Sequence, residues 1–368
     1  MSIQRNYFEK LKKLPITLII LISIICSIGF VVLYSASDSN IQPWAYKQMM
    51  IFFLFIPIVM IITIIDIKYI FKFSYIFYVT VIILLVSVEL FGSIAMGAKR
   101  WIDLGVIRLQ PSEPTKLAIV LMLARYFHQL KTEDFTRLHK ILLPIIAVIL
   151  PVLLIIKEPD LGTGVITIII ASIMFFAVGF RVKNFIIIGI IVVTCIPVIW
   201  QVMHDYQKKR VMVFLDPEKD PLGAGYNIIQ SKIAIGSGGL WGKGLAKGSQ
   251  SNLKFLPEHQ TDFIFATFAE EFGFVGSLFL LILYSAIIVI SLMIATNCRT
   301  IFSKLMVIGI TSILFSHVFI NIAMVMGLLP VVGVPLPFIS YGGTMMVSML
   351  IGFGLVMNAQ IHQHSSSF

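Results

Sequence analysis

The stretch WGKGLAKGSQSNLKFLPEHQTDFIFATFAEEFG, residues 241–273, joins a polar, glycine-rich loop to a strongly apolar run. Asp262 stands where that run begins, and Thr261 precedes it. We expect Thr261 to be a helix N-cap, which would place the Asp262 carboxylate in the first turn, where the helix dipole favours its charged form. Such a carboxylate at a membrane boundary suggests a site for a polar group attached to a lipid; a simple helix cap is the alternative.

The composition is that of an integral membrane protein. Hydrophobic residues make up 58% of the 368 positions and charged residues only 12%. Apolar runs of about 20 residues recur along the chain, the length that an α-helix needs to cross a bilayer core of roughly 30 Å. We predict an all-α polytopic bundle of about ten transmembrane helices, near 16–36, 45–66, 70–92, 113–130, 140–157, 161–180, 184–203, 262–296, 302–328 and 340–360.

We expect one transmembrane domain over residues 1–368, with one long extracytoplasmic loop at about 204–261. The eighth predicted helix is long for a single crossing, so we expect it to tilt or to extend into the cytosol. Glycines between 236 and 244 suit a backbone that approaches a ligand closely.

The net charge of +10 does not indicate nucleic acid, because Lys and Arg gather in alternate short loops. That pattern follows the positive-inside rule and predicts a multi-pass membrane protein with both termini in the cytoplasm. The polar segments 93–116, 157–163, 204–262 and 327–343 then all face the extracytoplasmic side. Cys26, Cys195 and Cys298 are isolated and form neither a disulfide framework nor a metal motif.

Residues 97–116 combine two features of interest. Lys99 and Arg100 are adjacent cations that suit a phosphate or pyrophosphate. Ser112 is the expected N-cap of the next helix, with Glu113 in its first turn. Glu113 and Lys116 are spaced i,i+3 and are expected to pair; a structural salt bridge that makes two buried charges tolerable is the favoured interpretation for Lys116.

Three further charges, Lys157, Glu158 and Asp160, lie between two apolar runs and need water, partners or a substrate. Asp160 is the expected N-cap of the second run. In the ninth predicted helix, His317 and Asn321 are spaced i,i+4, and an interhelical hydrogen bond is their expected use.

Four ordered motifs resemble the SEDS family of polytopic membrane proteins. They are GAKRWIDLGVIRLQPSEPTK at 97–116, EPDLGT at 158–163, KGSQSNLKFLPEHQTDFIFATFAEEFGFVG at 247–276 and GLLPVVGVPLPFISYGG at 327–343. The last motif is more similar to the RodA branch of the family than to the FtsW branch. Where the family commonly has Arg-His before the Thr-Asp pair, this chain has His259 and Gln260.

The resemblance implies a peptidoglycan glycosyltransferase that polymerises lipid II for cell-wall elongation, an inverting transfer with Asp262 as the general base. A free aspartate has a pKa of about 3.9, so we expect partial desolvation of Asp262. The leaving pyrophosphate needs cations or a divalent metal, Mg²⁺ or Mn²⁺, and no organic cofactor is expected. The expected substrate-binding residues are Lys99, Arg100, Gln110, Glu113, Lys116, Asp160, Glu258, Thr261 and Ser340.

The resemblance also implies a place in the bacterial cytoplasmic membrane, membrane-lipid contacts, an elongation complex and a partner transpeptidase, a class B penicillin-binding protein. Three alternatives stay open: a lipid II flippase or transporter, an FtsW-type division polymerase, and a non-catalytic scaffold. Because a flippase needs polar access from both faces, the placement of the polar segments on one side favours surface chemistry over transport.

Overall fold

The computed structural model describes residues 13–95, 98–103, 108–130, 138–203, 205–220, 223–248 and 258–363. A helix occupies each of the ten predicted positions, so that prediction is confirmed. The helices are α2 (Ile16–Ala36), α3 (Trp44–Ile64), α4 (Ile67–Phe91), α5 (Ser112–Gln129), α6 (Leu138–Lys157), α7 (Leu161–Val178), α8 (Val182–Val202), α12 (Ile264–Asn297), α13 (Ile301–Val325) and α14 (Gly343–Ile361).

Within the described ranges, eight of these helices are long and apolar enough to cross a membrane, and α5 and α8 are not among the eight. Glu113, Lys116 and Arg125 give α5 a polar character. It tolerates them because it lies inside the bundle, packed on α4, α6, α7, α13 and α14, with most of its side chains buried. Burial in protein replaces burial in lipid there, so a purely hydrophobic sequence is unnecessary.

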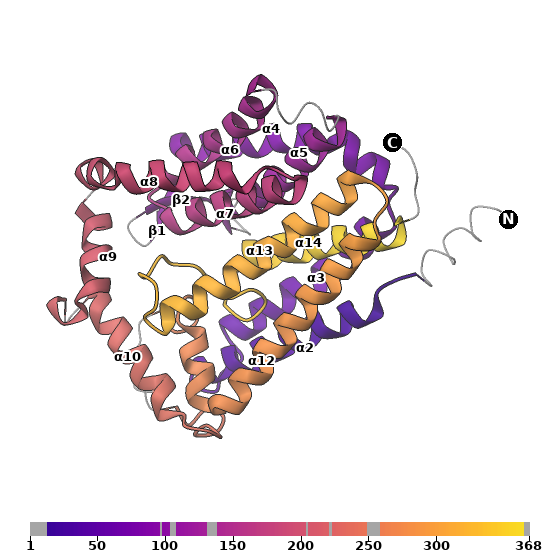
Figure 1. Ribbon diagram of the computed structural model, residues 1–368. Coiled ribbons are helices and arrows are strands. Elements are labelled where there is room, and N and C mark those ends of the chain that lie inside the picture. The colour runs from indigo at the N-terminus through magenta and orange to yellow at the C-terminus, as the bar shows by residue number, and fades with distance from the viewer. Residues whose placement is uncertain are drawn as a thin grey trace.

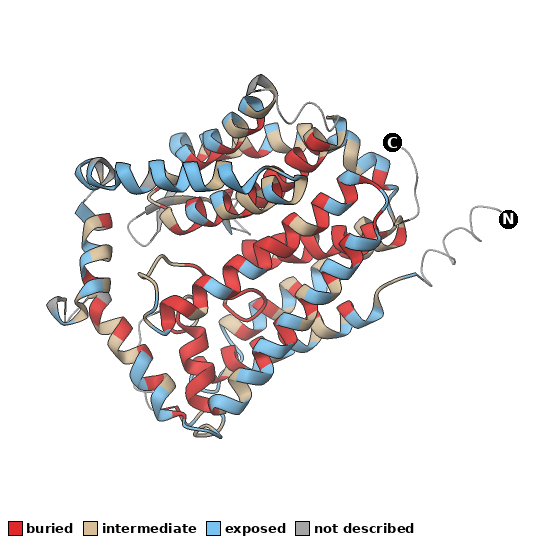
Figure 2. Ribbon diagram, viewed as in Figure 1, coloured by how far each residue is buried: buried red, intermediate tan, exposed pale blue. Residues whose placement is uncertain are grey.

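The helices lie in two groups (Figure 1). One group contains α4 to α8; the other contains α2, α3, α12, α13 and α14, and α9 (Asp205–Leu215) and α10 (Ala224–Ser237) run along one side from the first group to the second. The start of α2 and the end of α14 lie at the opposite side from α9 and α10. Figure 2 shows α13 and α14 largely buried, whereas apolar side chains on the outer helices are exposed, as a lipid-facing surface requires.

Two segments have more structure than the sequence predicted. Residues 93–109 form a small antiparallel sheet of β1 (Ser93–Ala95), β2 (Ala98–Asp103) and β3 (Arg108–Leu109), in that order. The described part of the predicted long loop contains α9, a short 3₁₀ turn η2 (Pro217–Lys219) and α10. These short elements lack the long apolar runs on which the prediction of transmembrane helices depends.

The eighth predicted helix, α12, runs to Asn297 and contains a kink that the sequence did not predict. Gly273, with φ of 66°, interrupts α12, and a Cβ there would lie 2.3 Å from the Gly242 nitrogen. Gly242 is equally tight, since its Cβ would lie 2.1 Å from the carbonyl oxygen of Glu271. At least at Gly242, the close backbone approach is therefore to α12 and not to a ligand.

Lys243 fixes this contact by donating to the buried Glu270 carboxylate at 2.6 Å. The backbone NH of Lys243 also donates to the carbonyl oxygen of Glu270 at 3.0 Å. The segment after α10 is thus anchored to the first part of α12, which carries Asp262 at its entrance.

Candidate active site

Asp262 lies in a turn immediately before α12. The helix begins at Ile264 and its N-cap is Phe263, without a side-chain cap, so the predicted N-cap role of Thr261 is wrong. The Thr261 hydroxyl instead donates to the Glu258 carboxylate at 3.1 Å. Glu258 accepts from Thr261 and has φ of 56°, a left-handed turn that bends the chain back before the helix starts. The Asp262 carboxylate is consequently held outside the helix.

The segment 327–343 packs directly on this turn. The Asn321 amide of α13 donates to the backbone oxygen of Asp262 at 2.8 Å and to that of Val334 at 2.6 Å, which joins the two segments. A Cβ on Gly333 would lie 3.4 Å from Asp262 Oδ2. Ser340 adds a second link, since its hydroxyl donates to the Thr261 oxygen at 2.6 Å. Asn321 of α13 and the segment 327–343 therefore fix the position of Asp262 through backbone groups.

The electrostatic surroundings raise the pKa of Asp262 to about 6, mainly because of burial and then because of the Glu258 charge. Arg210 and Arg100 act in the opposite direction, and Asp160 raises the pKa further. The expected desolvation of Asp262 is therefore present. Arg210, on α9, was not predicted as a site residue, because it lies 52 positions before Asp262 and no local spacing connects the two.

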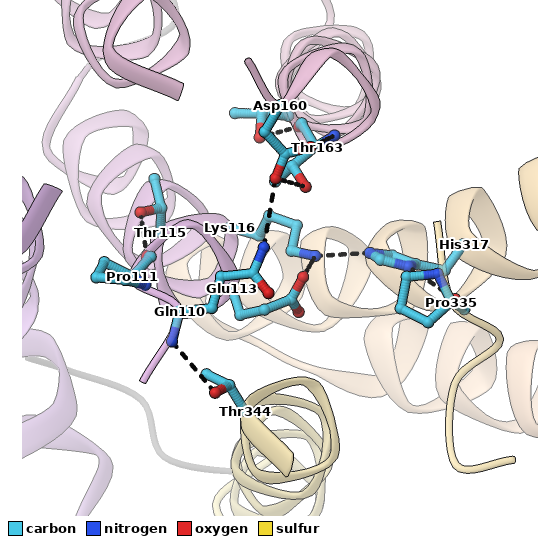
Figure 3. Close-up of polar contacts among 11 residues, drawn as sticks. Gln110, Pro111, Glu113, Thr115, Lys116, Asp160, Thr163, His317, Pro335 and Thr344 are labelled. Carbon is cyan, nitrogen blue, oxygen red and sulfur yellow. Dashed lines mark hydrogen bonds and ion pairs between the residues drawn. The ribbon is translucent and has the colours of Figure 1, made fainter. Parts of the chain in front are cut away.

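Beneath this turn, Lys116 of α5 forms a fully buried ion pair. Its ammonium lies 2.9 Å from Glu113 Oε1 and 2.7 Å from His317 Nε2, and the two paired side chains are only 2% and 6% exposed. His317 Nδ1 lies 3.3 Å from the Pro335 oxygen (Figure 3). The consistent assignment has Nδ1–H donating to Pro335 and Nε2 accepting from Lys116. The predicted i,i+3 pair and the interhelical bond of His317 are both confirmed.

A second polar network lies at the start of α7. Asp160 is its N-cap and accepts from the Thr163 backbone at 3.2 Å, which confirms that prediction. The Thr163 hydroxyl donates to Asp160 Oδ2 at 3.0 Å, and the Gln110 amide donates to the same oxygen at 3.3 Å (Figure 3). Ser112 is not the N-cap of α5: Pro111 is, without a side-chain cap, and Ser112 is the first helical residue.

Arg100 of β2 lies close to the same region. Arg100 donates to the backbone oxygens of Glu158 (3.0 Å) and Pro159, so it holds the α6–α7 junction. Lys99 is also in β2, but its side chain lies outside the part of the chain that the structure describes.

His259, one of the two departures from the family pattern, points away from Asp262. Its Nε2 lies 3.0 Å from the Ala36 oxygen, and its ring packs edge-on against Trp44. The side-chain amide of Gln260 donates to the Glu258 carboxylate at 3.4 Å, and the backbone oxygen of Gln260 accepts from the backbone NH of Tyr341. Both residues thus stabilise the turn.

A metal site is not preformed by the described residues, among which no three His, Cys, Asp or Glu side chains cluster. Asp160 is already occupied by Thr163 and Gln110. Mg²⁺ is commonly held by one or two carboxylates together with substrate phosphates, and Asp262 and Glu258 offer no more than that. We route no chemical step through a metal.

The fold and the site define a multi-pass membrane protein with a carboxylate in the turn before α12 and a buried ion pair inside the same bundle. The model of the family described as cell cycle protein, FtsW/RodA/SpoVE, matches residues 15–365, so the chain belongs to this family, the SEDS family. Membership confirms the resemblance seen in the four motifs.

Similar proteins define the class of this protein within the family more narrowly. The chain is 49% identical, over 78% of its length and 77% of the relative's, to the peptidoglycan glycosyltransferase MrdB, a RodA protein, of Escherichia coli K12. It matches a chain of a peptidoglycan synthase complex that coordinates polymerization and crosslinking, with TM-score 0.83, 27% identity and coverage of 96% and 99%. The rod-shape-determining protein RodA of Thermus thermophilus matches with TM-score 0.72, 25% identity and coverage of 96% and 98%. The chain is thus a membrane glycosyltransferase of RodA type.

Proposed function

We propose that the chain polymerises lipid II into glycan strands for cell-wall elongation, by an inverting transfer with Asp262 as general base. The hydroxyl oxygen of the acceptor sugar attacks the anomeric carbon of the donor. The bond between that carbon and the phosphate oxygen breaks, and its electron pair leaves with undecaprenyl pyrophosphate. The hydroxyl proton passes to the Asp262 carboxylate.

The observation that carries this proposal is the position of Asp262 in the turn before α12, held there through its backbone oxygen in surroundings that raise its pKa. Glu113 and Asp160 have close cationic or hydrogen-bonding partners. Asp262 has a pKa raised to about 6, so it is a stronger base than a free aspartate and still mostly deprotonated at pH 7. Those are the properties that proton abstraction from a sugar hydroxyl requires.

The departing pyrophosphate requires positive charge. Arg100 and Arg210 both act electrostatically on Asp262, which supports a place for the donor pyrophosphate within reach of them. Lys99 remains a candidate from sequence. We assign Lys116, Glu113, Gln110 and Asp160 to the polar surroundings of the bound substrate, and Glu258, Thr261 and Ser340 to the positioning of Asp262.

We further propose that the site faces the extracytoplasmic side and that both termini are cytoplasmic. The positive-inside pattern supports this orientation, as does the position of α9 and α10 opposite the ends of α2 and α14 (Figure 1). The match to a peptidoglycan synthase complex supports a partner transpeptidase, which we expect to be a class B penicillin-binding protein.

The test is glycan synthesis by purified protein with fluorescent lipid II, with and without the transpeptidase. Wild type and an Asp205→Asn control, at an exposed acid that begins α9, should give glycan ladders, and Asp262→Asn should not. Equal ladders from wild type and Asp262→Asn would remove Asp262 as the base. Movement of labelled lipid II across liposomes without any ladder would favour the flippase instead.

A further inference from the structure

Between α4 and the α6–α7 junction lies a cavity of about 120 Å³ that the transfer reaction does not use. Its lining residues are Leu85, Glu89, Leu154, Lys157, Glu158 and Pro159. Glu89 is near the end of α4 and Lys157 ends α6, so the cavity opens at the boundary of the apolar region, where lipid headgroups lie.

The Glu158 side chain is the unusual member of this lining. The residue is only 6% exposed, yet both of its carboxylate oxygens are buried without a hydrogen-bond partner. Arg100, the nearby cation, donates to the backbone oxygens of Glu158 and Pro159 and not to this carboxylate. A buried acceptor pair without donors is costly, so the site is incomplete without a donor group.

The mouth of the cavity carries one charge of each sign, Lys157 and Glu89. Lys157 forms an exposed ion pair with Glu89, and its side chain is 65% exposed. Apolar side chains continue from the mouth along both helices, with Leu90 of α4 66% exposed and Leu153 of α6 60% exposed. A ligand with an ammonium group for Glu158, a phosphate for Lys157 and apolar chains for α4 and α6 would contact all three features.

We propose that this cavity binds the headgroup of an ethanolamine phospholipid, with its primary ammonium donating to the Glu158 carboxylate and its phosphate beside Lys157. A trimethylated choline headgroup has no N–H donor and is bulkier, so it should bind more weakly. Without a ligand, burial first and the Asp160 charge second raise the pKa of Glu158 to about 8, and the bound ammonium would favour the ionised form.

The experiment measures lipid retention by the purified full-length protein, using native mass spectrometry in detergent with phosphatidylethanolamine, phosphatidylcholine and phosphatidylglycerol of matched chains. Wild type should retain phosphatidylethanolamine about tenfold better than phosphatidylcholine, the factor expected for a charge-assisted hydrogen bond. Glu158→Gln should abolish this preference. Glu218→Gln, a matched change at an exposed acid on η2, should leave it intact.

Lys157→Gln should weaken retention of all three phospholipids, because it removes the phosphate contact. Equal retention of phosphatidylethanolamine and phosphatidylcholine by wild type would overturn the proposal, as would an unchanged preference in Glu158→Gln. Stronger retention of phosphatidylglycerol than of phosphatidylethanolamine would also overturn it. If Glu158→Gln does not fold, retention by wild type is measured with ethanolamine lipids that carry zero, one, two or three N-methyl groups. The proposal requires retention to fall with each added methyl group.

Discussion

Asp262 and the Lys116–Glu113 pair belong to the same polar region but hold their charges in opposite ways. Lys116 and Glu113 are closed in by each other and by His317, with almost no exposed surface. Asp262 is partly exposed in a turn before α12, fixed through its backbone by Asn321, with a raised pKa. The comparison teaches that one polar region can contain two kinds of charged group: a closed ion pair between helices, and a carboxylate that the proposed function uses as the base.

The largest expected effect is on Asp262 itself. Asp262→Asn keeps the size of the side chain but removes its ability to take a proton, so the polymerisation rate should fall by roughly 10²–10⁴-fold. Rates with fluorescent lipid II measure this, with thermal unfolding as the control for folding. A loss below about threefold would mean that the base is another residue.

The second prediction concerns the ion pair. Lys116→Met leaves Glu113 buried and uncompensated, which should reduce the free energy of unfolding by about 3–5 kcal/mol. Lys209→Met, at the exposed pair with Asp220, should cost at most about 1 kcal/mol. Adding Glu113→Gln to Lys116→Met should recover much of the loss. Without such recovery, the charge of Glu113 is not the cause.

A smaller effect is expected when the support of Asp262 is removed. Asn321→Ala deletes the bonds to the Asp262 and Val334 oxygens, and kcat should fall roughly tenfold because a small displacement of the base is enough. Asn358→Ala is the matched control. Its amide bonds the Ile62 and Ile65 oxygens at the end of α3, so it should lower the melting temperature without a comparable change in kcat. Equal effects on kcat would make Asn321 merely structural.

The smallest effect is expected at Gly333. Its φ of 73° is strained for alanine, and the new Cβ would contact Asp262, so Gly333→Ala should reduce the rate severalfold. Gly179→Ala provides the comparison: Gly179 also has a positive φ, of 99°, but a Cβ there meets no atom within 4 Å. It should destabilise the protein to a similar extent with little change in rate. If both variants lose rate equally, contact with Asp262 is not the reason.

Much of the fold is predictable because long apolar runs have few physical solutions. The ten helix positions follow from the sequence, and in the described residues eight of these helices are long and apolar enough to cross a membrane. The Asp160 cap and the Lys116–Glu113 pair follow from local spacing. The kink at Gly273 does not follow from run length or spacing, because it depends on contact with the backbone of Gly242, 31 positions earlier in the chain. The predicted N-cap role of Thr261 was wrong because its hydroxyl donates to the Glu258 carboxylate in the turn before the helix.

The candidate site was predictable only in part for the same reason. Lys116 and Glu113 are neighbours in sequence, but His317 joins them from α13 and Asn321 reaches Asp262 across the bundle. Arg210 affects Asp262 from α9, a segment whose composition suggests only a membrane surface. Contacts between segments far apart in sequence leave no spacing signal, and one sequence alone does not reveal them.

The most direct test of the account is the pH dependence of single-turnover polymerisation between pH 5 and 8. Asp262 acts as a base only when deprotonated, so its raised pKa places the acid limb of the profile near pH 6 instead of near 4. Wild type should gain about tenfold in rate from pH 5 to pH 7, and the residual rate of Asp262→Asn should lack this limb. A wild-type profile that is flat across this range, or a limb that persists in Asp262→Asn, would contradict the assignment of Asp262 as the base.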